Sequence, residues 1–103
     1  MPRIGRYARA IAKSGQGDRL AEILLGEARA AEAQPGCELY VINRIADEPD
    51  TIWVTEVWRS QEDMDAALAD ARERGAIEQA LAVIDHFAEP IELIPVGGKG
   101  VVG

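Results

Sequence analysis

The sequence is poor in the residues that bind metals and form disulfides. It has one cysteine, Cys37, and one histidine, His86, among 103 residues. An intrachain disulfide is therefore excluded, and Cys and His side chains are too few for a zinc-type ligand set, so we expect no metal site. A reactive thiol at Cys37 is one interpretation, but a cysteine between a turn and a strand is more often a small packing residue.

Long apolar runs and an excess of positive charge are also missing. The chain has no run of about 18 apolar residues, and its arginine-containing N-terminal segment lacks the continuous apolar region of a signal peptide. Eleven basic residues against 18 acidic ones give a net charge of −7 at pH 7, which repels phosphate backbones and anionic lipids. We expect a cytoplasmic protein that binds neither nucleic acid nor membranes.

Strand and helix patterns alternate along the chain. Short segments bounded by turn residues predict strands at residues 4–11, 37–45, 51–58 and 91–96. Apolar residues three and four apart predict one helix over 18–34, and a second helical region that begins after Ser60, is interrupted at 72–75 and ends at residue 90. The order β-α-β-β-α-β predicts an α+β, ferredoxin-like split βαβ fold, with an antiparallel sheet and helices on one face.

Apolar residues occupy both faces of the third predicted strand. Ile52 and Val54 point to one side, whereas Trp53 and Val57 point to the other. The predicted helices can cover only one face of the sheet, so we expect a homodimer that buries the other face. The chain is expected to be one domain over 1–103, whose glycine-rich residues 97–103 form a C-terminal arm that reaches the partner subunit.

A carboxylate interrupts the apolar row on the first of these faces. Glu56 shares that face with Trp58, because residues two apart in a strand point to the same side. Burial would raise the pKa of Glu56 and suit it to act as a general base, while Trp58 would be a flat wall for an aromatic ligand. Alternatively, Glu56 pairs with Arg6 or Arg9 on a neighbouring strand, and Trp58 is a core residue.

Asn43 is a candidate substrate-binding residue whose placement depends on the hairpin register. If the turn pairs Ala46 with Thr51, Asn43 lies opposite Val54 and can orient a substrate hydroxyl group. A shift of one residue would turn the Asn43 side chain to the other face of the sheet.

Two further candidates lie on the second predicted helical region. Met64 would give the pocket an adaptable apolar surface, although methionine at helical spacing is more often core. Asp85 and His86 are neighbours of the types that form acid–base pairs, but adjacent residues on a helix do not face each other. We therefore interpret this pair as structural.

Several short motifs occur together in one order along nearly the whole chain: PGC at 35–37, DEPD at 47–50, EVW at 56–58, RSQE at 59–62 and PVGGKG at 95–100. With them the chain resembles the antibiotic biosynthesis monooxygenase domain family, which includes quinol monooxygenases and belongs to the dimeric α+β barrel superfamily. The resemblance implies a dimeric barrel and chemistry without a cofactor. In that chemistry a deprotonated quinol, phenol or anthrone passes an electron directly to O₂.

The chain departs from this family at positions that bear on function. Many relatives carry a histidine pair where this sequence has Met64 and Ala67, and some oxygenases have an asparagine in place of Val54. Haem-degrading relatives carry a second tryptophan and an iron-binding histidine, but no tryptophan follows Trp58 and the one histidine is His86, so we expect no haem.

Two functional hypotheses follow from the sequence. The first is a cofactor-independent monooxygenase that acts on a small electron-rich aromatic substrate. The second is a non-catalytic dimeric module that binds a small molecule or another protein. Isomerisation of a small sugar fits less well, because the predicted pocket residues are mostly apolar.

Overall fold

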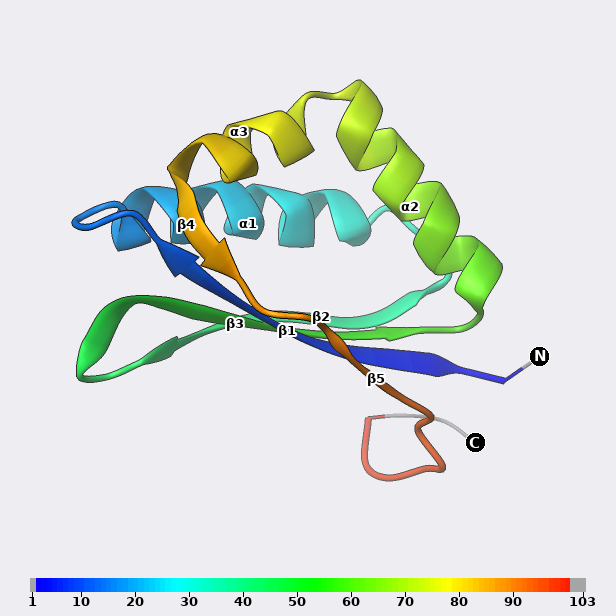
Figure 1. Ribbon diagram of the computed structural model, residues 1–103. Helices are drawn as coiled ribbons and strands as arrows, with labels where there is room; N and C mark the ends of the chain where they lie inside the picture. Colours follow the sequence, from blue (N-terminus) through cyan, green and yellow to red (C-terminus); the bar gives the residue numbers. More distant parts are fainter. Residues whose placement is uncertain (1, 101–103) are drawn as a thin grey trace.

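The computed structural model describes residues 2–100 and shows an α+β fold built on one antiparallel sheet. The elements are β1 (Ile4–Ala12), α1 (Gly17–Ala31), β2 (Cys37–Ile45), β3 (Glu48–Trp58), α2 (Gln61–Glu73), α3 (Ala76–Val83), β4 (Ile84–Phe87) and β5 (Ile91–Leu93). All three helices lie over one face of the sheet (Figure 1). The predicted fold class is therefore confirmed. No helix in the described part of the chain is long and apolar enough to cross a membrane.

The sheet has the strand order β2-β3-β1-β4, and β5 also pairs with β1. In the ladder between β1 and β3, Arg6 lies opposite Glu56 and Ala8 lies opposite Val54. Because side chains alternate along a strand, the even-numbered residues of β1 and β3 face the helices and the odd-numbered residues face away. We call these two surfaces the inner face and the outer face of the sheet.

The hairpin between β2 and β3 differs from the prediction. Ile45 pairs with Glu48, so the connection is a two-residue turn, and a register shift follows between Arg44 and Ile45. Beyond this irregularity Asn43 pairs with Trp53, one residue away from the predicted partner. The predicted pairing of Asn43 with Val54 is therefore wrong, and Asn43 lies on the outer face.

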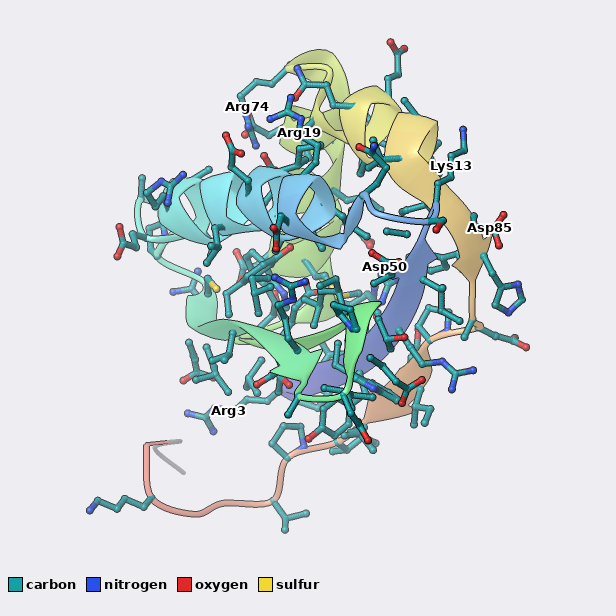
Figure 2. The ribbon with its side chains drawn as sticks, turned by 90° about the vertical axis from the view of Figure 1, so that its left-hand side faces the viewer. Arg3, Lys13, Arg19, Asp50, Arg74 and Asp85 are labelled. Carbon is teal, nitrogen blue, oxygen red and sulfur yellow. The ribbon has the colours of Figure 1, made fainter. Side chains whose placement is uncertain are left out.

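The irregular start of β3 is also where the hairpin meets α1. The Asp50 carboxylate accepts hydrogen bonds from the backbone N–H groups of Gly15 at 3.1 Å and Gly17 at 2.9 Å. Figure 2 shows the labelled Asp50 side chain beside the start of this helix. A Cβ atom at Gly17 would lie 2.1 Å from the Pro49 carbonyl oxygen, so the close approach requires glycine. Asp50 thus caps α1 in place of a residue from the helix itself.

The segment after α3 was predicted to be helical, but it forms strand β4. Ile84 pairs with Ala12 and Phe87 pairs with Ala10, and the register shifts between these pairs. The irregularity brings two residues three apart in sequence to the inner face, where a regular strand would place them on opposite faces. The helix prediction was wrong because this spacing imitates the period of a helix.

The N-terminus of α2 agrees with the capping pattern in the sequence. Ser60 is the N-cap residue, and its Oγ accepts a hydrogen bond from the Asp63 backbone N–H at 3.2 Å. The Asp63 side chain packs on Gly36, where an added Cβ would lie 2.4 Å from the carboxylate carbon. These contacts start α2 directly after β3 and place Met64 beside Trp58 in a buried cluster.

The outer face of the sheet is apolar and open in the single chain. The Tyr7 and Trp53 rings meet edge to face at a centroid distance of 5.8 Å, and the Arg9 guanidinium lies 5.6 Å from the centre of the Trp53 ring. On the same face, Val41 is 40% exposed and Leu93 is 43% exposed.

Residues 94–100 leave the sheet on the side away from the helices (Figure 1). Ile94 and Val96 are strongly exposed there. Val101 and Val102, which we expected to contact a partner subunit, lie outside the described residues.

Candidate functional site

A cavity of about 340 Å³ lies between the inner face of the sheet and the helices. Its floor is formed by small and branched residues of β1 and β3, including Ala8, Ala10 and Val54. Its roof comes from α1, α2 and α3, whose apolar residues, such as Leu24 and Ile77, point down to the sheet. A cavity of this size and character suits a small, largely apolar molecule.

Glu56 and Trp58 lie together in the wall of this cavity. Trp58 is only 2% exposed, and its Nε1–H donates a hydrogen bond to Glu56 Oε1 at 2.9 Å. Burial raises the pKa of Glu56, while the hydrogen bond from Trp58 and the positive charge of Arg6 act in the opposite direction. A half-buried carboxylate with a raised pKa is suited to exchange a proton with a bound molecule.

The cavity wall also contains Arg6, directly across from Glu56 in the ladder. Among residues 2–100, however, Glu56 forms no ion pair with an arginine. Arg9, the other arginine considered as a partner, lies on the outer face against Trp53. The alternative interpretation of Glu56, an ion pair with a β1 arginine, is therefore not supported by the described residues.

Tyr40 is a cavity residue that the sequence did not single out. It pairs with Glu56 across the β2–β3 ladder and lines the same wall. Burial and the nearby Glu56 carboxylate raise the pKa of Tyr40, so the phenol is neutral at neutral pH. The sequence did not reveal this residue because Leu39, Tyr40, Val41 and Ile42 place apolar side chains on both faces of β2.

Two predicted substrate-binding residues lie on opposite sides of the sheet. Met64 lines the cavity and is 6% exposed, in contact with Trp58. Asn43 lies outside the cavity, and its Nδ2 donates hydrogen bonds to the Trp53 carbonyl oxygen at 3.3 Å and to Thr55 Oγ1 at 3.2 Å. The structure thus brings Glu56, Trp58 and Met64 together and separates Asn43 from them.

The rim of the cavity contains an ion pair between two helices. Arg74, which follows α2, donates to both carboxylate oxygens of Glu27 on α1, at 2.8 and 3.0 Å. It also pairs with Asp70 at 2.8 Å. Figure 2 shows Arg74 at the helical end of the molecule, far from the open face of the sheet. The Arg74 guanidinium is therefore already paired with carboxylates of the protein itself.

No group of three or more His, Cys, Asp and Glu side chains in residues 2–100 is placed to hold a metal ion. His86 is exposed on β4 and pairs with Ile11, so it lies on the outer face and is not a cavity residue. Asp85 and His86, which were predicted to lie on a helix as structural residues, both belong to strand β4.

Similarity to solved structures agrees with this architecture. A protein from Chloroflexus aurantiacus J-10-fl, provisionally described as an antibiotic biosynthesis monooxygenase, is 36% identical; the match covers 97% of this chain and 99% of that chain, with a TM-score of 0.84. A mutant form of SnoaB, a cofactor-independent oxygenase from Streptomyces nogalater, is 15% identical over 96% of this chain and 98% of its own, with a TM-score of 0.79. Rv0793 from Mycobacterium tuberculosis is 18% identical over 94% and 98%, respectively, with a TM-score of 0.80.

Curated proteins give no match to the sequence. The family model for antibiotic biosynthesis monooxygenase matches residues 4–79, which include the first three strands, α1, α2 and the cavity residues that they carry. This match and the 36% identity to the Chloroflexus protein confirm the resemblance found in the sequence. The chain belongs to the antibiotic biosynthesis monooxygenase family.

Proposed function

We propose that the protein is a cofactor-independent monooxygenase that oxidises a small electron-rich aromatic molecule, such as a quinol, phenol or anthrone, with O₂. The observation that carries this proposal is the Glu56 carboxylate in an apolar cavity, with a raised pKa and a hydrogen bond from Trp58. SnoaB, which shares the fold, is described as a cofactor-independent oxygenase.

Glu56 acts as the base in this proposal. It takes a proton from the substrate, and the resulting anion passes one electron to O₂, giving a substrate radical and superoxide. These two combine to form a carbon–oxygen bond, and the proton held by Glu56 returns to the peroxide. For an anthrone, loss of water from this peroxide leaves a new carbonyl group, so one oxygen atom enters the product and the other leaves as water.

Trp58 and Met64 position the aromatic ring in the same proposal. Trp58 is held by its hydrogen bond to Glu56 and by its contact with Met64, so its ring is a fixed wall of the cavity. Flat aromatic molecules bind well against such a wall, and the apolar surroundings keep water away from the reactive anion.

The proposed active form is a homodimer in which the outer faces of two sheets pack together. Support comes from the exposed apolar residues on this face and from the 94–100 segment, which projects to the same side with Ile94 and Val96 exposed. Packing of a second subunit would remove this apolar surface from water. The arm over 97–103 would then extend along the partner.

A second candidate is a binding module that keeps the cavity but does not catalyse oxidation. The observation in its favour is that no histidine lines the cavity, where Met64 and Ala67 occupy the positions of a histidine pair common in relatives. A binding module would require the apolar wall and not the base.

An oxygen electrode separates these two functions. The wild-type protein is dialysed against a chelator and offered a panel of quinols, phenols and anthrones without added flavin. O₂ uptake that depends on protein and substrate is the expected result. Activity that is lost on dialysis and restored by flavin would contradict the cofactor-free mechanism. Binding of the aromatics without O₂ uptake would favour the binding module.

A further inference from the structure

Arg6 is a positively charged cavity residue without a hydrogen-bond or ion-pair partner in the described part of the chain. Its Nε atom is shielded from solvent and has no hydrogen-bond partner within residues 2–100. No hydrogen bond or ion pair of the guanidinium group is formed in this part of the chain. The side chain itself lines the cavity beside Ala8 and Glu56.

The absence of an ion pair is notable because two carboxylates flank Arg6. Glu56 on β3 and Glu92 on β5 are its cross-strand partners, yet neither binds the guanidinium. Arg3 binds Glu38, whereas Arg9 stacks on Trp53 on the outer face, although its Nε likewise has no hydrogen-bond partner within residues 2–100. A buried N–H donor is unfavourable unless an acceptor satisfies it. Arg6 is therefore free to bind a molecule in the cavity.

We propose that Arg6 binds the ionised oxygen of the substrate, and that the substrate class is an aromatic alcohol that enters neutral and is held as its phenolate. This inference rests on the proposed function, in which Glu56 takes the hydroxyl proton. The substrate O–H bond breaks, the proton joins the Glu56 carboxylate, and the negative charge moves to the aromatic oxygen. Before the transfer the negative charge opposite Arg6 is on Glu56, and after the transfer it is on the aromatic oxygen. The positive charge of Arg6 is therefore opposed by one negative charge throughout the step.

The remaining charged and titratable groups of the cavity do not compete for this role. Glu27 and Arg74 are paired with each other at the rim. Tyr40 stays neutral because its pKa is raised, and Arg72, which also lines the cavity, is exposed to solvent in the last turn of α2. Within the described residues, Arg6 is the cavity cation that faces Glu56 across the floor.

A nitrophenol tests this inference, because its absorbance reports whether the bound molecule is ionised, and no O₂ chemistry is needed. The test uses a Glu56→Gln background, which removes the carboxylate that β3 places opposite Arg6. We expect the pKa of the bound nitrophenol to lie below its value in water. Adding Arg6→Met should raise that pKa by about one unit or more, a tenfold or larger change in the ionisation constant, as expected for loss of a nearby opposite charge.

Two further variants control for charge and fold. Arg6→Lys keeps a positive charge and should retain part of the effect, whereas Arg19→Met removes an exposed arginine of α1 and should leave the bound probe unchanged. Circular dichroism confirms that each variant is folded. An equal pKa of the bound probe in the Arg6→Met and Arg19→Met proteins, or no binding of nitrophenol to the parent protein, would overturn the inference. A protein that holds the phenolate through Arg6 but consumes no O₂ would uphold this inference and contradict the monooxygenase proposal.

Discussion

The two faces of the sheet use the same kinds of residue in different ways. On the outer face, Arg9 stacks on Trp53, which in turn meets the edge of Tyr7. On the inner face, the Trp58 N–H donates a hydrogen bond to Glu56, and Arg6 has no hydrogen-bond or ion-pair partner among residues 2–100. Arg9 thus contacts an aromatic ring of the protein itself, whereas Arg6 lies beside a cavity where a ligand can reach it.

The two tryptophans of β3 show the same difference between the inner and the outer face, because they differ in exposure. Trp58 is 2% exposed under the helices, while Trp53 is half-buried on the open side among exposed apolar residues. Both lie on β3, five residues apart, and the alternation of the strand separates them. The inner face therefore suits a small molecule, and the outer face suits another protein surface.

The largest expected effect comes from the inner carboxylate. Glu56→Gln keeps shape and hydrogen bonding but removes the base, so O₂ uptake with an active quinol should fall about 10²- to 10⁴-fold while binding is retained. Glu92→Gln is the matched control, because Glu92 also lies opposite Arg6 but is exposed and outside the cavity. Equal rates for the two variants would remove Glu56 from the mechanism.

The second effect concerns stability. Trp58→Ala removes a large ring from the core and should lower the free energy of unfolding by about 3–5 kcal/mol. Trp53→Ala should cost less in dilute protein, because that ring is already partly exposed. In the proposed dimer the cost of Trp53→Ala grows with protein concentration. Urea unfolding at two protein concentrations measures the free energy of unfolding of both variants. Equal losses of stability in the two variants would contradict the contrast between the faces.

Much of the fold could be predicted because local signals agree with the tertiary structure. Ser60 with Asp63 marks the start of α2, and the predicted strand at 37–45 coincides with β2. Two features were beyond the sequence because each depends on a strand irregularity. Ile84 and Phe87 are three residues apart, as on one face of a helix, but a bulge brings both to the inner face of a strand. A two-residue turn followed by a register shift places Asn43 on the outer face.

Only the part of the candidate site that depends on local strand alternation could be predicted from the sequence. Strand alternation places Glu56 and Trp58 on one face, which is a local property of β3. Whether Glu56 pairs with Arg6 depends on the direction of two long side chains, and alternation does not determine that direction. Tyr40 was missed because β2 has apolar residues on both faces.

The third prediction tests the outer face as an interface. Val41→Asp places a charge on that face and should weaken the dimer by about 2 kcal/mol, roughly thirtyfold in the dissociation constant. Leu25→Asp is the control, because Leu25 is similarly exposed at 45% but lies on α1. Analytical ultracentrifugation measures the dissociation constant. A monomeric wild-type protein at micromolar concentration would refute the dimer.

A smaller effect is expected from the C-terminal arm. Deletion of residues 97–103 removes the proposed contact with the partner and should raise the dimer dissociation constant by about tenfold or less, equivalent to roughly 1.4 kcal/mol. The inner cavity and the binding of an aromatic should not change. Unchanged dissociation of the shortened protein would show that the arm does not contribute to the interface.

The smallest effect is the pH dependence of stability that Glu56 causes. Burial raises the folded-state pKa of Glu56 above its ordinary value, so the folded chain holds this proton more tightly than the unfolded chain does. The stabilisation is complete below the unfolded pKa and is lost as the pH rises through the folded pKa. As the pH rises from the unfolded pKa through the folded pKa, the free energy of unfolding of the wild-type protein should therefore fall relative to that of Glu56→Gln. A difference that grows in the opposite direction in urea titrations would contradict the burial of Glu56.

The most direct test of the account is the fluorescence of each tryptophan during titration with an aromatic ligand. The chain has two tryptophans, so Trp53→Phe leaves Trp58 as the reporter of the inner face, and Trp58→Phe leaves Trp53 as the reporter of the outer face. We predict that a quinol, titrated under nitrogen, quenches the emission of the protein that retains Trp58 and leaves the protein that retains Trp53 unchanged. Quenching of Trp53 with no change at Trp58 would place the ligand on the outer face and contradict the account.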